Sequence, residues 1–242
     1  MDTPIDSVLL QTLSERVEAG LAQIHATIAT VGRDPASITI IGVTKGWGPE
    51  APLAGLANGL TLFGENYADE LVSKAAAVQR ALDAGLPDRA AVVGSPKWTF
   101  QGKLQSNKIN RLKDIVSLWQ TIDSVERAEA LGSRVPDADV FVQVVLDRSG
   151  ERSGCDPTAL PVILEAATRA GLQVQGLMGV APDVALFGAD VSTAAFAQIK
   201  QLADAHHLGS LSIGMSGDYA TALRFGATHL RLGSVLFGQR SL

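Results

Sequence analysis

Short apolar runs alternate along this chain with longer segments in which apolar residues recur at helical spacing. The opening segment, 5–31, predicts an amphipathic helix. The first short run, 38–44, is rich in β-branched residues and is followed by Lys45 and Gly46, as expected for a buried parallel strand. Seven more strands are predicted at 60–63, at 90–93 divided from 98–100, at 115–122, 140–146 and 172–180, and in the runs beginning at Leu211 and His229. Helices are predicted between them at 49–58, 67–84, 124–132, 157–170, 191–206 and 219–225.

Eight strands that alternate with helices predict a single (β/α)8 TIM-type barrel, an α/β fold that here carries an extra N-terminal helix. Each strand of such a barrel is buried on both faces, which agrees with the continuous apolar runs. The alternative is an open, doubly wound sheet, for which a Gly-x-Gly-x-x-Gly turn is expected after the first strand. Residues 42–46 do not supply that turn. Without an internal repeat, a low-complexity segment or a linker, residues 1–242 are expected to form one domain.

The charge balance predicts that nucleic acid is not a partner, because the net charge is -5 and no basic cluster interrupts the chain. Cys155 is the only cysteine, so no internal disulfide can form, and a reducing compartment is indicated. The opening residues 1–6 are acidic and lack the basic and apolar regions of a signal peptide. Since no apolar stretch is long enough to span a membrane, we expect a cytoplasmic protein.

Lys45 and two glycine-containing turns are the candidate chemical groups. The amine of Lys45 is expected at the carboxyl end of a barrel strand, where burial lowers the pKa of a lysine and makes it a nucleophile toward an aldehyde. The turns 214–218 and 233–238 carry Ser216 and Ser234, whose hydroxyls can bind phosphate together with nearby backbone N–H groups. Barrels often bind phosphate after strands seven and eight. Taken singly, a lysine at this position is more often a solvated or ion-paired residue. Each of the two turns, taken singly, is more often an ordinary helix start.

Seven motifs in one order resemble those of a known family. They are Thr44-Lys45, Phe63-Gly64-Glu65-Asn66-Tyr67, Trp98-x-Phe100-x-Gly102-x-Leu104-Gln105-x-Asn107-Lys108, Ser153-Gly154-Cys155, Gly176-Leu177-Met178-Gly179, Gly214-Met215-Ser216-x-Asp218 and Arg231-x-Gly233-x-x-x-Phe237-Gly238. Over residues 38–239 this pattern is similar to that of the YggS/PROSC family, the pyridoxal-phosphate homeostasis proteins. The resemblance implies a barrel like the N-terminal domain of bacterial alanine racemase. It also implies that pyridoxal 5'-phosphate (PLP) is carried as a lysine aldimine, with no established turnover.

The resemblance further implies seven cofactor-binding residues: Lys45, Asn66, Met215, Ser216, Arg231, Gly233 and Ser234. Lys45 would form the aldimine and Asn66 would line the cofactor ring. The two turns would bind the phosphate. Arg231 would face the pyridine nitrogen, and because a permanent cation cannot accept the pyridinium proton, the ring would stay neutral and be a poorer electron sink. The alternative for Arg231 is a salt bridge across the barrel mouth.

Three positions depart from the family pattern. Thr99 stands where the family usually has histidine, Lys103 stands where histidine or a similar residue is frequent, and Arg152 replaces a lysine that often precedes Ser-Gly-Cys. These changes put in doubt any auxiliary role of those side chains, but they leave the lysine and phosphate groups intact.

The remaining cysteine, carboxylate and tyrosine side chains are expected to have structural roles. No residues have the spacing of metal ligands. Cys155 is expected to be an inert loop thiol. Glu65 and Asp69 are expected to favour the dipole at a helix start. Tyr67 and Tyr219, the only tyrosines, are expected to pack at helix starts.

Two functions from different classes follow. The first is a non-catalytic carrier and buffer that holds PLP and passes it to PLP-dependent apoenzymes, and the second is a small PLP-dependent racemase or related enzyme. Alanine racemase needs a further β domain that brings a catalytic tyrosine across a dimer interface, whereas this chain stops at Leu242. The sequence therefore favours the carrier, expected to be a monomer.

Overall fold

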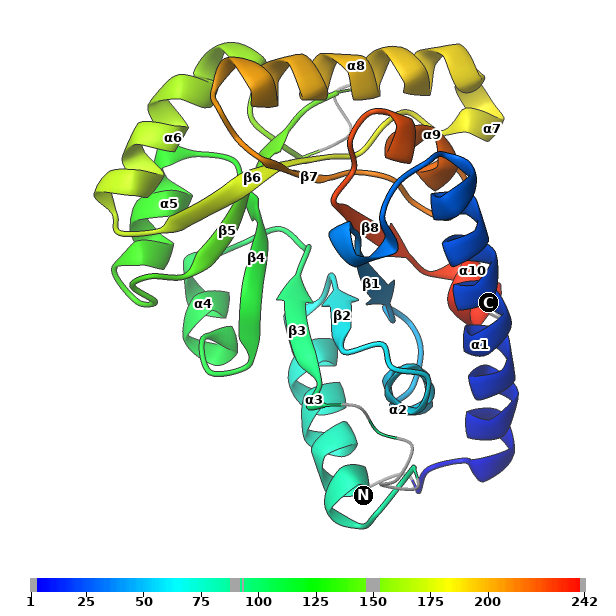
Figure 1. Cartoon of the computed structure of the whole chain (residues 1–242). Helices are drawn as coiled ribbons and strands as arrows, with labels where there is room; N and C mark the ends of the chain where they lie inside the picture. Colours follow the sequence, from blue (N-terminus) through cyan, green and yellow to red (C-terminus); the bar gives the residue numbers. More distant parts are fainter. Residues whose placement is uncertain (1–3, 88–91, 93, 147–152, 240–242) are drawn as a thin grey trace.

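Eight parallel strands close into a barrel in the computed structural model of the chain, which describes residues 4–87, 92, 94–146 and 153–239 (Figure 1). The strands are β1 (Thr39–Val43), β2 (Leu62–Glu65), β3 (Lys97–Phe100), β4 (Val116–Ile122), β5 (Asp139–Val144), β6 (Gln173–Gly179), β7 (Ser210–Ser212) and β8 (His229–Leu232). Each strand pairs with the next along the chain, and β1 pairs with β8 to close the barrel. The predicted TIM-type barrel is confirmed.

Helices surround the barrel, as Figure 1 shows. They are α1 (Ser7–Thr30), α2 (Glu50–Ala57), α3 (Ala68–Asp83), α4 (Ser106–Leu112), α5 (Val125–Gly132), α6 (Leu160–Arg169), α7 (Val184–Phe187), α8 (Ala189–Ala205), α9 (Tyr219–Arg224) and α10 (Ser234–Phe237), with 3-10 turns at Pro35–Ser37 and Pro157–Ala159. The predicted N-terminal helix is confirmed as α1. Asp6 caps it by accepting hydrogen bonds from the backbone N–H groups of Val8 and Leu9. Its buried stripe, which includes Leu13, Val17 and Ile24, packs on α2 and α10.

Three short helices and one strand boundary differ from the prediction. Helices α4, α7 and α10 were not predicted, because each has seven residues or fewer and is too short to show a helical period. The divided third strand is correct only in its second part, since β3 begins at Lys97. Of its first part, Val92 is outside any strand, and residues 90, 91 and 93 lie outside the described residues.

The order of the strands places the candidate residues next to one another. Because β1 lies between β2 and β8, the residue that follows β1 has the ends of those two strands on either side. In the register, Gly42 of β1 pairs with both Phe63 of β2 and Leu232 of β8. Lys45 therefore emerges between Asn66, just after β2, and Gly233, just after β8.

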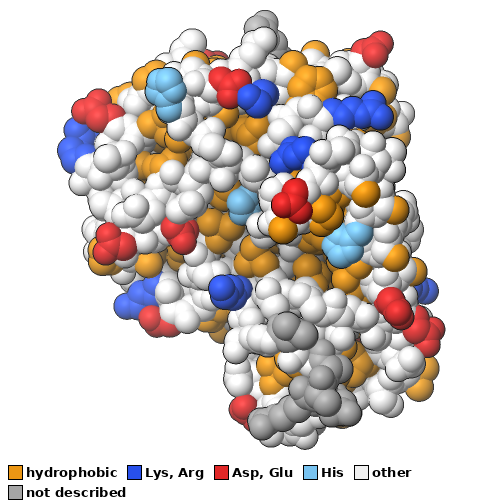
Figure 2. Space-filling model, viewed as in Figure 1, with side chains coloured by type: hydrophobic (Ala, Val, Ile, Leu, Met, Phe, Trp, Pro, Cys, Tyr) orange, Lys and Arg blue, Asp and Glu red, His pale blue; other side chains and the backbone are white. Residues whose placement is uncertain are grey.

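The surface carries charges of both signs. On the face seen in Figure 2, Lys and Arg side chains are interspersed with Asp and Glu rather than separated from them. No helix in the described part of the chain is both long and apolar enough to cross a membrane.

Candidate functional site

A cavity of about 730 Å³ opens at the carboxyl ends of the barrel strands. All seven residues predicted to bind the cofactor line it: Lys45, Asn66, Met215, Ser216, Arg231, Gly233 and Ser234. They come from the segments that follow β1, β2 and β7 and from β8 and the turn after it, so residues nearly two hundred positions apart meet in one space. This end of the barrel is where TIM-barrel enzymes place their reactive groups.

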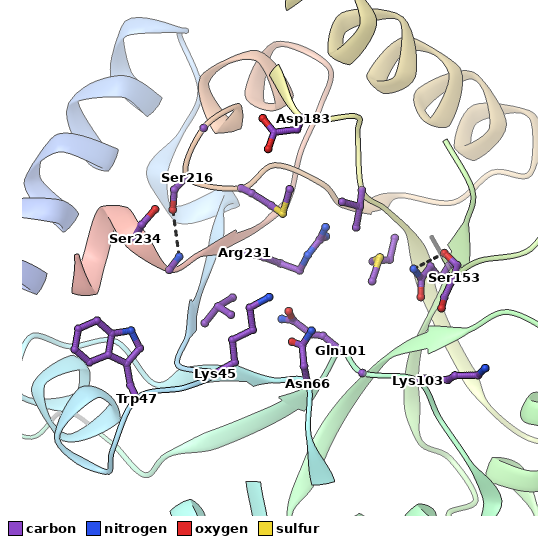
Figure 3. Close-up of a pocket in the computed structure, with 18 of the residues that line it drawn as sticks. Lys45, Trp47, Asn66, Gln101, Lys103, Ser153, Asp183, Ser216, Arg231 and Ser234 are labelled. Atoms are coloured by element: carbon purple, nitrogen blue, oxygen red, sulfur yellow. Dashed lines mark hydrogen bonds between the residues drawn. The ribbon is translucent and has the colours of Figure 1, made fainter. Parts of the chain in front are cut away.

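Lys45 is half-buried, and its side chain extends into the cavity from the end of β1. Figure 3 shows its amine pointing toward the side where Arg231, Asn66 and Gln101 lie. The indole of Trp47 lines the cavity on the other side of Lys45 and packs near Phe237, with the ring centroids 6.5 Å apart. The amine is thus placed where it can meet a ligand held between the strand ends.

The two glycine-containing turns are joined through the Ser216 hydroxyl. Its Oγ accepts hydrogen bonds from the backbone N–H of Gly233 at 3.3 Å and from that of Val235 at 3.2 Å. Gly214 has a φ of +94°, a conformation that a residue with a side chain rarely adopts, and it turns the chain after β7 toward Ser216. Ser234 lies exposed beside this contact on the cavity wall. Hydroxyls and backbone amides are therefore gathered at one end of the cavity.

Arg231 is buried in the cavity wall, with 4% of its surface exposed. Its guanidinium donates to the carbonyl oxygens of Ser212 and Gly179 and to Ser212 Oγ. Burial lowers the pKa of Arg231 to about 10, with the nearby Asp218 acting in the opposite direction. Because that value is still well above neutrality, Arg231 remains a cation at physiological pH.

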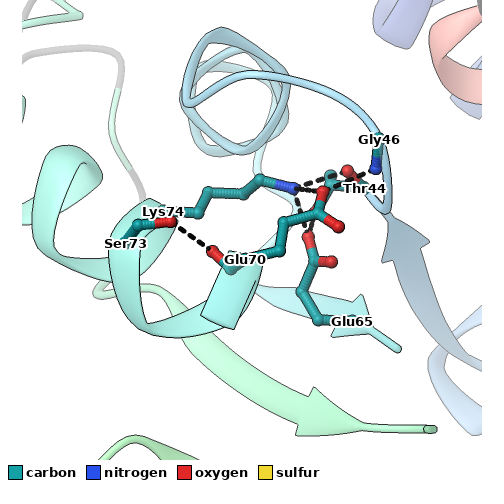
Figure 4. Close-up of polar contacts among 6 residues, drawn as sticks. All are labelled: Thr44, Gly46, Glu65, Glu70, Ser73 and Lys74. Carbon is teal, nitrogen blue, oxygen red and sulfur yellow. Dashed lines mark hydrogen bonds and ion pairs between the residues drawn. The ribbon is translucent and has the colours of Figure 1, made fainter. Parts of the chain in front are cut away.

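A buried ionic cluster contacts Thr44 and Gly46, the residues on either side of Lys45 (Figure 4), and it shows that the prediction for Glu65 was wrong. Glu65 is the last residue of β2 and is fully buried, whereas it was expected at a helix start. Its Oε1 accepts from Thr44 Oγ1 at 2.6 Å and from Lys74 Nζ at 2.5 Å. Burial raises the pKa of the Glu65 carboxyl, although Lys74 and Thr44 oppose this effect. Asp69, the other half of that prediction, is exposed in the first turn of α3 and pairs with Arg111.

The same cluster holds the backbone on both sides of Lys45. Lys74 Nζ donates to the carbonyl oxygen of Thr44 at 2.6 Å, and Glu70 Oε1 accepts from the backbone N–H of Gly46 at 2.5 Å. Lys74 also pairs with Glu70 at 2.8 Å, one helical turn away on α3. The sequence prediction missed Lys74, because a lysine at that spacing on an amphipathic helix looks like an ordinary surface residue.

Further cavity residues come from strands and loops whose proximity the sequence patterns did not reveal. Gln101, Gln143, Ser153 and Met178 are among them. The Nε2 of Gln101 is buried without a hydrogen-bond partner among the described residues. Gly102 allows this loop to lie against the chain after β2, because a Cβ at that position would come within 1.8 Å of the Asn66 carbonyl oxygen.

Comparisons with known proteins identify the family of the chain. The family described as "Alanine racemase, N-terminal domain" matches residues 21–241. This chain belongs to that family.

Among its relatives, a pyridoxal phosphate homeostasis protein of Pseudomonas aeruginosa is 32% identical over 238 residues, covering 96% of this chain and 97% of the relative. One of Deinococcus radiodurans is 35% identical over 226 residues, covering 91% and 99%. The structure of PipY of Synechococcus elongatus with PLP bound has a TM-score of 0.73 and 29% identity, and covers 93% of this chain and all of that one. The predicted resemblance to the pyridoxal-phosphate homeostasis proteins is confirmed.

The departures from the family pattern occupy different places in this alanine racemase-like barrel. Lys103 is exposed at the rim of the cavity, while Thr99 is fully buried inside the barrel. Arg152 lies outside the described residues. Tyr67 was wrongly predicted to pack, since 64% of its surface is exposed, whereas Tyr219 is buried as predicted.

Cys155 is buried, and desolvation raises the pKa of its thiol to about 11, which is consistent with the prediction of an inert thiol. In the described ranges, no group of three or more His, Cys, Asp or Glu side chains is arranged to hold a metal ion.

His229 is expected to lower the free energy of unfolding of this protein at acidic pH. It lies against Phe141 inside the barrel, and burial, assisted by the charge of Arg231, lowers its pKa from 6.5 to about 4. Between those values the unfolded chain binds more protons, so the free energy of unfolding should fall by about 3 kcal/mol as pH drops from 6.5 to 4. Urea denaturation at several pH values measures this effect. The loss should shrink in His229→Asn and persist in His25→Asn, which changes an exposed histidine of α1. An unchanged pH dependence in His229→Asn would exclude this residue as the cause.

Proposed function

We propose that this protein holds PLP covalently through Lys45 and acts in PLP homeostasis as a carrier and buffer of the cofactor. The observation that carries the proposal is the single cavity that brings Lys45, Arg231 and the two hydroxyl-bearing turns together. We further propose that it works in the cytoplasm as a monomer and delivers PLP to PLP-dependent apoenzymes. The names of its relatives and the PLP-bound structure of PipY support the cofactor.

The residues of the cavity fit an aldehyde that carries a phosphate. The Lys45 amine supplies the nucleophile for the aldehyde. The backbone N–H groups of Gly233 and Val235 now reach Ser216 Oγ over long hydrogen bonds, and phosphate oxygens would replace the hydroxyl on them. Ser216 and Ser234 would then donate to the same phosphate. The buried Nε2 of Gln101 offers one more donor, which a polar ligand would satisfy.

Arg231 determines what a bound PLP can do. PLP acts in enzymes as an electron sink, and it does so best when its ring nitrogen is protonated. A guanidinium has only N–H donors and keeps its charge here, so it can donate to the ring nitrogen but cannot accept a proton from it. This disfavours carbanion chemistry and favours storage of the cofactor.

The phosphate assignment predicts a loss of affinity in serine variants. Ser216→Ala and Ser234→Ala each remove a hydroxyl that donates to a dianion, and such bonds contribute roughly 1.5 to 3 kcal/mol. Each change should therefore weaken PLP binding by about ten-fold or more in an equilibrium titration of the apo-protein. Ser133→Ala, which removes an exposed hydroxyl far from the cavity, should bind as the wild type does. Unaltered affinity in the Ser216/Ser234 double variant would remove the phosphate assignment.

A proton-exchange experiment separates the carrier from an enzyme. PLP-loaded protein is incubated with L-alanine, L-serine or L-glutamate in deuterated water, and exchange of the α-proton is followed by NMR. A carrier should give no exchange above that of free PLP, because racemisation needs a positioned acid and base. Such a pair typically accelerates proton transfer by about 100- to 10,000-fold. Rapid exchange that disappears in Lys45→Ala would overturn the carrier and establish a PLP-dependent enzyme.

A further inference from the structure

A chain of buried polar side chains runs across the barrel interior and ends on Arg231. Arg231 donates to Ser212 Oγ at 2.9 Å, Ser212 Oγ donates to Gln120 Oε1 at 2.5 Å, and Gln120 Nε2 donates to Thr99 Oγ1 at 2.9 Å. All four side chains are buried, and Gln120, Ser212 and Thr99 are fully so. Of these four side chains, only Arg231 is proposed to contact the cofactor.

The contacts join opposite walls of the barrel. Thr99 and Gln120 lie on the adjacent strands β3 and β4, whereas Ser212 and Arg231 lie on β7 and β8. Strands β4 and β7 are not neighbours in the closed sheet, so the bond between Ser212 and Gln120 crosses the barrel interior. Buried polar groups are costly unless they are paired, and here each of the four side chains is paired with another of the set.

The direction of donation gives the chain a role beyond packing. Every bond is donated away from the cation, from Arg231 to Ser212, then to Gln120, then to Thr99. Bonds aligned in this way polarise one another, and the charge at the head strengthens them. Ser212 also accepts through its backbone carbonyl, so the guanidinium is held at two atoms of one residue. The Thr99 hydroxyl is the neutral acceptor at the end of this series of hydrogen bonds. The family usually has histidine at that position.

We propose that Thr99, Gln120 and Ser212 are positioning residues that fix the guanidinium of Arg231 at the cavity wall and thereby set the environment of the ring nitrogen of bound PLP. This inference rests on the proposed function, because it requires PLP in the cavity with its ring nitrogen toward Arg231. Specificity for the nitrogen-containing ring is thus determined partly by residues that never touch the cofactor.

Two identical substitutions on adjacent strands test the inference. Thr99→Val removes the acceptor at the end of the chain. Thr121→Val makes the same change at a buried threonine of β4 whose Oγ1 has no hydrogen-bond partner among the described residues. Thr121 follows Gln120 on the same strand but forms none of the bonds of this polar chain. Affinity is measured for PLP and for its 1-deaza analogue, in which a carbon replaces the ring nitrogen.

In Thr99→Val, affinity for PLP should fall about five-fold, a change that corresponds to one ordinary hydrogen bond. The absorption maximum of the bound cofactor should shift, and affinity for the deaza analogue should stay at the wild-type value. Thr121→Val should alter none of these, and Thr99→Ser, which keeps the hydroxyl, should restore them. Gln120→Leu breaks two of the bonds, so it should bind PLP about ten-fold more weakly while its affinity for the deaza analogue stays at the wild-type value. This variant serves as the test if the Thr99→Val protein does not fold.

If Thr99→Val lowered the affinity for both ligands equally, or for neither, the positioning role would be overturned while the carrier function would remain intact. If the wild-type protein bound neither ligand, the proposed function itself would fail, and the positioning role would fall with it.

Discussion

Replacing Lys45 with alanine is expected to abolish the visible absorption band of the PLP-loaded protein. The band arises when the cofactor is bonded to a lysine amine, and Lys45 is the lysine whose side chain extends into the cavity between Asn66 and the turns that carry Ser216 and Ser234. The alanine side chain offers no nucleophile, so any remaining PLP would be held only by its phosphate and ring contacts. Absorption spectroscopy of the purified protein after reconstitution with PLP and desalting is the measurement.

Lys103→Ala is the matched control for that change, because Lys103 is the other lysine on the cavity wall but lies exposed at its rim. We expect its band to match that of the wild type. A band of unchanged intensity in Lys45→Ala would instead show that the cofactor is attached to another lysine, with Lys103 and Lys108 the next to be substituted.

Replacing Lys74 with methionine is expected to destabilise the fold by about 3 to 5 kcal/mol. Lys74 is buried against the fully buried Glu65, and their side chains are 2.5 Å apart. Removing the cation leaves a buried carboxylate with no opposite charge beside it and only the Thr44 hydroxyl as a donor, which is far more costly than losing an exposed ion pair. The free energy of unfolding from urea denaturation measures the effect.

Lys200→Met serves as the control for Lys74→Met, since Lys200 pairs with Asp204 on the exposed surface of α8. That change should cost roughly 0.5 kcal/mol or less. Adding Glu65→Gln to Lys74→Met should recover part of the lost stability, because the remaining buried group is then neutral. A loss below about 1 kcal/mol in Lys74→Met would contradict the structural role of the cluster.

The barrel was predictable because its strands are apolar runs separated by glycine-containing turns. The run before Lys45 is buried or half-buried, the runs at 115–122 and 140–146 are mostly buried, and few polar residues interrupt the apolar pattern of any of them. Helix α4 has no such signal. It has seven residues, of which only Ile109 and Leu112 are buried, and no side-chain cap marks its start.

The candidate site was predictable only where a local motif marks it. Lys45 and the two turns occur at strand ends, and the rules of barrel architecture then bring those ends together. Gln101 and Gln143 also line the cavity, but a glutamine near a strand end has no distinctive local pattern. The roles of Glu65 and Lys74 depend on a pairing between the end of β2 and the interior of α3, which local spacing cannot reveal.

The polar chain behind Arg231 could not be predicted at all from the sequence. Gln120 and Ser212 are ninety-two residues apart, and they meet only because the closed barrel places β4 and β7 across the same interior. Ser212 stands between apolar neighbours and Gln120 follows Trp119, as is ordinary for strand residues, so only the closed barrel reveals their contact.

The most direct test of the account is to locate the bond between PLP and the protein. Reduction of the PLP-loaded wild-type protein with borohydride fixes the cofactor to its lysine, and proteolysis followed by mass spectrometry identifies the modified residue. The account predicts one modified site, Lys45, and none in Lys45→Ala. Modification of another lysine with Lys45 unmodified, or no modification of a protein that binds PLP, would contradict it.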